Sequence, residues 1–311
     1  MTDTAEIAAA PRGGTLPATV RAWLAALRLA AQDAYGVYHP PTAKPGRTPE
    51  QKGLTSEPVH VVTSRDRVRL DGWFVPGDGP HTVVVCHGMG RTKSAVLDHI
   101  KLLNGAGYHV LAYDLRNHGA SGRDGKVTAM AKRFTSDLRD VLRFVAADPR
   151  TKGGKIAVLA FSFSTWPAIY ALKAGGPRVA AVICDSGPMY DIPGGFRHFS
   201  ALRWGTLPAE ATRPGAQALY RKVFTLIGTR MLAVRGWPPA LPTTVTRMLF
   251  IGGAKDQVVP AAQVMRVAAE YPDAQRWVAP GAQHMNGVRL DREEYRERVT
   301  AFLAEACGGT A

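Results

Sequence analysis

Short apolar segments alternate with longer amphipathic segments through most of this chain. Some segments are apolar at nearly every position, which is typical of strands buried on both faces of a sheet. They are TVVVCH (82–87), YHVLAYD (108–114), KIAVLAF (155–161) and VAAVICD (179–185). Helical patterns separate them near residues 93–106, 135–147 and 163–174. This alternation predicts an α/β fold, with a mostly parallel sheet of about eight strands and helices on both faces.

The pattern extends to both sides of this region and is interrupted once. Residues 59–64 and 67–75 alternate in the manner of strands and predict a hairpin. Residues 188–246 instead contain Pro, Gly and aromatic residues with helical patches. The β/α pattern then resumes with segments 247–253, 260–271, 275–280 and 291–306. We interpret residues 188–246 as an insertion over the carboxyl edge of the sheet, where ligands bind, and therefore as a lid.

The region before the sheet has a pattern of its own. Residues 16–35 predict an amphipathic helix, and residues 39–57 form a linker rich in Pro and Gly. The apolar positions at helical spacing are Val20, Trp23, Leu24, Leu27 and Ala31. We expect the helix to dock on the rest of the chain; peripheral contact with a membrane surface is the alternative. The chain then divides into residues 1–57 (tail, helix and linker), residues 58–187 with 247–311 (core) and residues 188–246 (lid).

A net charge of +14 raises the question of a nucleic-acid or membrane partner. The basic residues are scattered, without a block of five or an interleaved aromatic motif, so we expect no nucleic-acid partner. Arg65, Arg67 and Arg69 alternate along an expected strand. We interpret them as one solvated face; an anion-binding stripe is the alternative.

Cysteine usage and the N-terminus favour the cytoplasm. Cys86, Cys184 and Cys307 cannot form a complete set of pairs, so we expect no disulfide framework and a reducing compartment. The first residues lack the layout of a signal peptide, and no run reaches the roughly 20 apolar residues of a membrane-spanning helix. We therefore expect a cytoplasmic protein, membrane-peripheral if its N-terminal helix contacts lipid.

The segment AFSFS (160–164) is the candidate for a catalytic nucleophile. A serine displayed on a strand–turn–helix corner needs small residues two positions before and after it, because backbones approach closely there. Ala160 and Ser164 meet this requirement around Ser162, whereas Trp166 would occupy the second position after Ser164. We therefore select Ser162 and interpret Ser164 as a small spacer, whose replacement by glycine should keep or raise activity. Alone, the pattern is also common in buried strands.

A nucleophilic serine also needs a base, an acid that orients the base, and N–H donors for the oxyanion. His284 follows the last expected strand, and Asp256 follows the one before it; Asp185 is a competing acid. The turn HGMG (87–90) offers the N–H of Met89, and Phe163 offers a second one. Taken one at a time, each has an ordinary alternative: His284 as a surface histidine, Asp256 as a helix-capping aspartate, and residues 87–90 as a plain glycine turn.

In combination, the candidates follow the order Ser…Asp…His, each after a strand and all after the glycine turn. The segments VVVCHGMGRTK, AYDLRNHGASG, IGGAKDQVVP and GAQHMNG resemble those of the α/β-hydrolase superfamily, over roughly residues 58–306. The resemblance implies a triad of Ser162, Asp256 and His284, oxyanion donors at Met89 and Phe163, and structural roles for Asp114, Arg116 and His118. AFSFS departs from the usual Gly-x-Ser-x-Gly of that superfamily.

These observations predict a lidded serine hydrolase that cleaves a carboxylic ester or thioester through an acyl-enzyme. The expected partner is a small acyl substrate with an apolar part, in a pocket lined by Phe161, Trp166, Tyr190, Phe196 and Trp204. The alternatives are an acyltransferase or biosynthetic thioesterase with the same triad, and a non-catalytic binding protein. Because dinucleotide, phosphate-loop and zinc-ligand patterns are absent from the sequence, we expect no cofactor and no metal. Oligomeric state is not indicated.

Overall fold

In the described part of the chain, one sheet of eight strands forms the centre of the fold. The computed structural model describes residues 16–42, 46–173, 178–203, 207–209, 213–241 and 246–308. The strands are β1 (Glu57–Val62), β2 (Arg69–Val75), β3 (Thr82–Cys86), β4 (His109–Tyr113), β5 (Ile156–Phe161), β6 (Val179–Asp185), β7 (Arg247–Gly253) and β8 (Gln275–Ala279). Their order is β1-β2-β4-β3-β5-β6-β7-β8. The pairs β1–β2 and β2–β4 are antiparallel and the others parallel, which confirms the predicted α/β-hydrolase fold.

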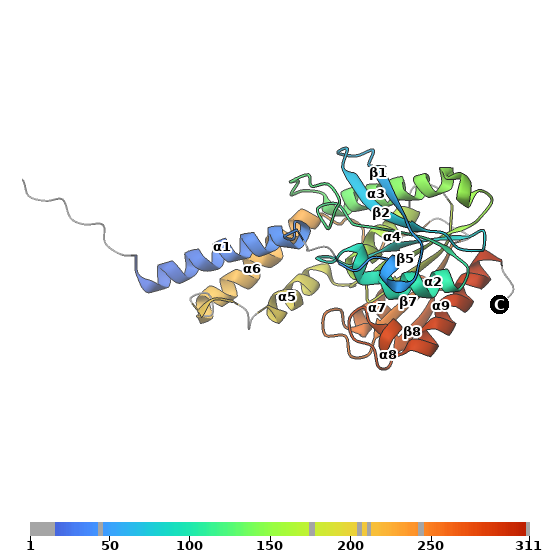
Figure 1. Cartoon of the computed structure of the whole chain (residues 1–311). Coiled ribbons are helices and arrows are strands. Elements are labelled where there is room, and N and C mark those ends of the chain that lie inside the picture. The colour runs from blue at the N-terminus through green and yellow to red at the C-terminus, as the bar shows by residue number, and fades with distance from the viewer. Residues whose placement is uncertain are drawn as a thin grey trace, which may run out of the picture.

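Helices cover both faces of the sheet (Figure 1). One face packs on α2 (Leu97–Gly105) and α9 (Arg292–Cys307). The other packs on α3 (Met130–Ala147), α4 (Thr165–Leu172) and α7 (Ala261–Ala268). Shorter elements are α8 (Gly287–Leu290) and the 3₁₀ turns Glu50–Lys52, Lys93–Val96, Pro149–Thr151 and Ser162–Ser164. Every residue of β3 and β5 is buried, because side chains on both faces of these strands lie under helices.

Three helices form an arm that projects from the sheet (Figure 1). Two of them, α5 (Ile192–Leu202) and α6 (Pro214–Leu232), come between β6 and β7 in the sequence. The third, α1 (Ala18–Tyr38), packs against α6. The predicted N-terminal helix therefore forms and packs on the chain. Its packed side is a stripe of small residues at four-residue spacing, Ala22, Ala26, Ala30 and Ala34, against Ala216, Tyr220 and Phe224.

The turn between β1 and β2 corrects one prediction. Residues 64–67 form this turn, and Asp66 and Arg67 have positive φ angles of 67° and 56°. Arg65, Arg67 and Arg69 therefore do not share one face of a strand. The predicted hairpin forms, but its second strand begins at Arg69 and not at Arg67. The sequence did not show that the turn extends to Arg67, because the turn contains neither Gly nor Pro.

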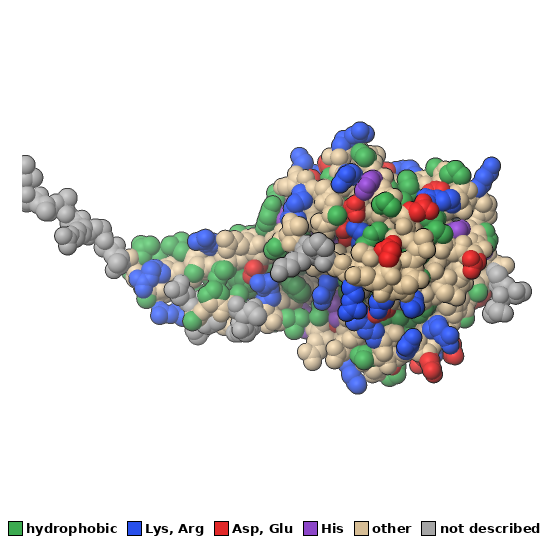
Figure 2. Space-filling view, in the orientation of Figure 1, with side chains coloured by type: hydrophobic (Ala, Val, Ile, Leu, Met, Phe, Trp, Pro, Cys, Tyr) green, Lys and Arg blue, Asp and Glu red, His purple; other side chains and the backbone are tan. Residues whose placement is uncertain are grey.

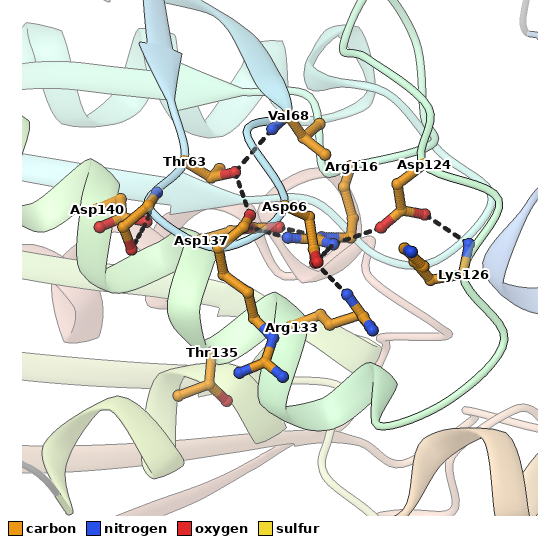
Figure 3. A network of polar contacts seen from close by, with 12 residues as sticks. Thr63, Asp66, Val68, Arg116, Asp124, Lys126, Arg133, Thr135, Asp137 and Asp140 are labelled. Atoms are coloured by element: carbon orange, nitrogen blue, oxygen red, sulfur yellow. Dashed lines mark hydrogen bonds and ion pairs between the residues drawn. The ribbon is translucent and has the colours of Figure 1, made fainter.

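A buried arginine joins this turn to the rest of the domain (Figure 3). Arg116 donates two hydrogen bonds to Asp137 on α3, at 2.6 and 2.5 Å, and further bonds to Asp66 and Asp124. Arg133 also bonds Asp66. Burial by itself would raise the pKa of Asp66, but the bonds from Arg133 and Arg116 lower it to about 2. The network ties β1–β2, the segment after β4 and α3 together.

The three cysteines are free and buried, and burial raises the pKa of Cys86 to about 12. Among the helices of the described residues, none combines the length and apolar character needed to cross a membrane.

Candidate active site

Ser162 lies at the corner between β5 and α4. Its φ angle is +52°, a region that a residue with a side chain seldom adopts. Two glycines make room for this corner. A Cβ atom at Gly187 would lie 2.5 Å from the Ser162 carbonyl oxygen, and one at Gly88 would lie 3.2 Å from Ser162 Cβ. The corner thus has the strained backbone and small neighbours of a nucleophile elbow, although the residues two positions away are Ala160 and Ser164.

Ser162, His284 and Asp256 form one chain of hydrogen-bonding distances. His284 Nε2 lies 3.0 Å from Ser162 Oγ, and His284 Nδ1 lies 2.8 Å from Asp256 Oδ2. With its proton on Nδ1, the imidazole donates to Asp256 and its Nε2 accepts the Ser162 hydroxyl. The structure therefore brings together three side chains that are 122 and 28 positions apart in the sequence.

The loop after β7 holds Asp256 in place. Its side chain is fully buried, and its second oxygen, Oδ1, accepts the N–H groups of Val258 and Val259 at 2.8 and 2.9 Å. A buried carboxylate that accepts two backbone bonds keeps a single orientation. Asp256 Oδ2 is thus held facing His284 Nδ1.

Asp185, the competing acid, has other partners. It accepts hydrogen bonds from Tyr295 Oη at 2.6 Å and from Ser186 Oγ at 2.8 Å. Burial raises its pKa to about 6. Ser186 Oγ in turn accepts the backbone N–H of Met285 at 2.9 Å, next to His284. Asp185 therefore supports the histidine loop through Ser186, a role that the sequence did not reveal because it depends on contacts between distant loops.

Buried histidines hold the glycine turn 87–90. His87 Nε2 accepts the N–H of Leu115 at 3.0 Å, and His118 Nε2 accepts the N–H of Gly90 at 3.0 Å. Burial lowers the pKa of His118 to about 3, so its ring is neutral and can accept. Asp114 accepts bonds from the backbone and side chain of Lys93. These contacts fit the structural roles that the family resemblance implies for the segment 114–118.

A cavity of about 690 Å³ opens beside Ser162 and His284. Several predicted residues line it, namely Met89, Phe163, Trp166 and Phe196. Phe161 and Tyr190 do not, and these two predictions need correction. Phe161 is fully buried on the opposite face of the sheet, against the ring of His99, because successive strand residues alternate in direction. Tyr190 stacks under Arg266 instead, and Trp204 lies outside the described residues.

Part of the cavity wall comes from α1, which sequence reasoning missed. Gln32, Gly36, Val37 and Tyr38 line the cavity. Tyr38 Oη donates to the Gly228 carbonyl oxygen at 3.0 Å, and its ring meets Phe163 edge to face. The stripe of alanines in α1 signals close helix packing, but no local pattern identifies the packing partner.

The described residues contain no group of three or more His, Cys, Asp or Glu side chains that could hold a metal ion. The groups that meet at this site are a serine hydroxyl, an imidazole and a carboxylate.

Known proteins resemble the chain along most of its length. The sequence model of the alpha/beta hydrolase family matches residues 83–298. The chain is 26% identical over 249 residues to the uncharacterized protein YqkD of Bacillus subtilis, with 78% of each chain covered. It is 25% identical over 252 residues to the uncharacterized protein MT2364 of Mycobacterium tuberculosis, which covers 79% of this chain and 78% of that protein.

Solved structures of esterases share this fold. The Pyrococcus furiosus esterase Pf2001 matches with a TM-score of 0.69 at 25% identity, covering 87% of this chain and 98% of that one. An esterase from Exiguobacterium antarcticum matches with a TM-score of 0.58 at 18% identity, covering 79% and 99%. The second likeness concerns the fold alone.

Proposed function

Because this chain belongs to the alpha/beta hydrolase family, we propose that it is a serine hydrolase that cleaves carboxylic esters or thioesters with an apolar acyl part. Ser162 is the nucleophile, His284 the general base and Asp256 the acid that orients it. The observation that carries the proposal is the pair of contacts at His284, 3.0 Å to Ser162 Oγ and 2.8 Å to Asp256 Oδ2, at the mouth of a cavity.

The first half of the reaction forms an acyl-enzyme. Ser162 Oγ attacks the substrate carbonyl carbon while its proton moves to His284 Nε2. The oxyanion accepts the N–H groups of Met89 and Phe163, two residues that line the same cavity. The bond to the leaving oxygen or sulfur then breaks, and His284 gives its proton to that atom. Asp256 stabilises the imidazolium during both transfers.

The second half releases the acid. A water molecule loses its proton to His284 Nε2 and attacks the acyl carbon, and the bond to Ser162 Oγ breaks as that oxygen regains the proton. The enzyme returns to its starting state. No external oxidant, reductant or metal is needed to balance this reaction.

The lining of the cavity supports a substrate with an apolar acyl part. Its volume of about 690 Å³ lies within the usual range for sites that bind small molecules. Aromatic and aliphatic side chains surround Ser162 from α4, α5 and the loops after β6 and β7, namely Trp166, Pro188, Ile192, Phe196 and Val259. We assign α5 and α6, within residues 188–246, to a lid that covers the acyl group.

Active-site labelling tests the proposal. A fluorophosphonate reagent should modify the wild-type protein at Ser162, located by mass spectrometry, and should leave Ser162→Ala unmodified. Hydrolysis of p-nitrophenyl butanoate should fall by about 10³-fold or more in Ser162→Ala and His284→Ala. Circular dichroism establishes that each variant is folded. A folded wild type that neither reacts with the reagent nor hydrolyses the ester would overturn the proposal.

A matched pair of variants tests the identity of the acid. Asp256→Asn replaces the carboxylate that accepts the proton of His284 Nδ1 by an amide, which favours the wrong tautomer of the imidazole. It should lower kcat by about 10⁴-fold, the effect of such a change in a well-studied serine triad. Asp185→Asn changes a carboxylate that bonds Tyr295 and Ser186, so most of the activity should remain. The opposite ranking of the two variants would assign the acid to Asp185.

A further inference from the structure

An apolar stripe runs along the outer side of α1. Its members are each between 38% and 51% exposed. They are Leu16, which precedes the helix, and Val20, Trp23, Leu24 and Leu27 within it, and we call them the α1 stripe. They include four of the five apolar residues that the sequence marks as a helix face, all except Ala31, yet α1 packs on α6 through other alanines. Figure 2 shows hydrophobic side chains along the projecting arm, with Lys and Arg side chains beside them.

The arrangement of the α1 stripe distinguishes it from scattered surface hydrophobics. Single exposed apolar side chains are normal on a protein surface, whereas a contiguous row on one helix face marks a binding surface. Four of the five residues recur at spacings of three and four from Val20 to Leu27, which places them on one side of the helix. The helical part of the stripe extends over about 10 Å from Val20 to Leu27.

Positive charge borders this stripe. Arg21 and Arg28 are seven residues apart, so both lie along the same edge of the apolar positions. In the described parts of residues 16–42 and 188–241, the acidic side chains are Asp33 and Asp191. Each of them lies within ion-pair distance of an arginine, Arg203 or Arg197. The described arm therefore carries an excess of positive charge next to its apolar stripe.

We infer that the α1 stripe with Arg21 and Arg28 is a docking surface for a lipid bilayer that contains anionic lipid. A helix with Trp and Leu on one side and arginines at the border lies in the interface of such a bilayer. There, the apolar side chains enter the acyl region and the arginines meet phosphate groups. The long arginine side chains can reach the headgroups while their stems cover apolar surface.

The α1 stripe lies close to the cavity beside Ser162. The same helix carries the α1 stripe and, from Gln32 to Tyr38, part of the cavity wall. Leu27 and Gly36 are nine residues apart, which corresponds to about 14 Å along a helix. Phe199 on α5 both lines the cavity and is exposed. A docked arm would hold the cavity close to the bilayer, so that a membrane-dissolved ester could enter it; this last step rests on the proposed function.

A second copy of the chain is the main rival occupant. A symmetric dimer through the α1 stripe would pair the same surface from both protomers and bring Arg21 and Arg28 of each close to those of the other. Like charges at an interface oppose association, whereas phosphate groups neutralise them. The charge of the arm therefore favours the anionic bilayer.

Vesicle binding by the full-length protein tests the inference. Co-sedimentation is measured with phosphatidylcholine vesicles, and with vesicles that also contain phosphatidylglycerol. Binding should be at least tenfold stronger to the anionic vesicles and should weaken as salt is raised. Leu24→Gln with Leu27→Gln, and separately Arg21→Gln with Arg28→Gln, should each reduce binding by on the order of tenfold. Circular dichroism checks that these exposed changes leave the fold intact.

The control variants make the same Leu→Gln and Arg→Gln changes at exposed positions outside the arm. Leu290 is 54% exposed, close to the 51% of Leu24, and Leu290→Gln should leave vesicle binding unchanged. Arg292 and Arg296 are exposed on α9, and Arg292→Gln with Arg296→Gln should have less than a twofold effect. An equal loss of binding in the arm and control variants would overturn the inference, because charge and apolar content alone would then explain it.

Two further results would count against docking of the α1 stripe on a bilayer. Failure of the wild type to bind anionic vesicles, or formation of a dimer that Leu24→Gln with Leu27→Gln dissolves in analytical ultracentrifugation, would overturn the inference. Ser162→Ala should bind vesicles as the wild type does. Vesicle binding without fluorophosphonate labelling would support the docking surface and contradict the proposed function. Labelling without vesicle binding would support the proposed function and contradict the docking surface.

Discussion

The hydroxyl group of Ser164 donates a hydrogen bond of 2.6 Å to the backbone carbonyl oxygen of His87. Ser164 is buried at the second position after Ser162, and His87 begins the glycine turn 87–90. The bond thus connects the corner that carries the proposed nucleophile to the turn that carries Met89. Ser164 does more than fill a small space, so the expectation that Ser164→Gly keeps or raises activity is revised.

Removal of this hydroxyl should weaken catalysis. In Ser164→Ala the His87 carbonyl loses its partner, and the two turns are less firmly aligned. We expect kcat/KM for p-nitrophenyl butanoate to fall about fivefold, the equivalent of one ordinary hydrogen bond. Thr135→Val removes a buried bond of similar length within α3, from Thr135 to Ala131. It should lower stability without this loss of activity, and equal activity losses in both variants would show that Ser164 acts only through stability.

Gly88 leaves no room for a side chain next to Ser162. A Cβ atom there would lie 2.8 Å from Met285 Sδ and 3.2 Å from Ser162 Cβ. Gly88→Ala should displace the glycine turn and lower kcat by about 100-fold, as small misplacements near a reacting centre do. Gly105 ends α2 in open space, and Gly105→Ala should keep full activity. Steady-state kinetics compare the two, and an active Gly88→Ala would show that the turn can adjust.

The buried Arg116 should be essential for stability. Arg116→Met leaves the buried carboxylates of Asp137 and Asp124 without their main cation, and we expect a loss of about 3–5 kcal/mol in the free energy of unfolding. Arg143, whose side chain is half exposed, pairs with Asp140, which also accepts two hydrogen bonds from Ser64, and Arg143→Met should cost at most about 1 kcal/mol. Urea unfolding monitored by circular dichroism measures both. Equal effects would contradict the structural role of the network in Figure 3.

His99 should make the fold sensitive to acid. Its ring is buried between Phe161 and Tyr295, neither ring nitrogen has a hydrogen-bond partner among the described residues, and burial lowers its pKa from 6.5 to about 3. A lowered histidine pKa means that the unfolded chain binds the proton first. Stability is therefore complete above pH 6.5 and decreases as the pH falls from 6.5 towards 3.

Replacement of this histidine by an apolar ring should remove that contribution. His99→Phe keeps an aromatic group against Phe161 and should be more stable than the wild type at pH 5 by on the order of 1–3 kcal/mol. This gain in stability should shrink towards pH 7, because the His99 ring is then neutral in both the folded and the unfolded chain. Thermal unfolding between pH 4 and pH 8 measures this difference. A gain that does not depend on pH would assign it to packing alone.

The sequence by itself determined the sheet and the order of the candidate site residues. A strand covered on both faces must be apolar at nearly every position, so β3, β5 and β6 are visible as apolar runs. Parallel strands end at one edge of a sheet, so residues that follow such strands are candidates to meet there. Ser162, Asp256 and His284 follow β5, β7 and β8, and the structure brings them within hydrogen-bonding distance.

Only the tertiary structure decided which side of α1 packs, which residues line the cavity, and what Ser164 and Asp185 contact. Both an alanine stripe and an apolar stripe on α1 could cover a partner, and the choice depends on α6, nearly 200 residues away in the sequence. Phe161 directly precedes Ser162 but packs on the other face of the sheet, and Tyr190 stacks under Arg266. Local periodicity specifies the direction of a side chain along its own element, whereas the surface that it meets depends on the packing of distant segments.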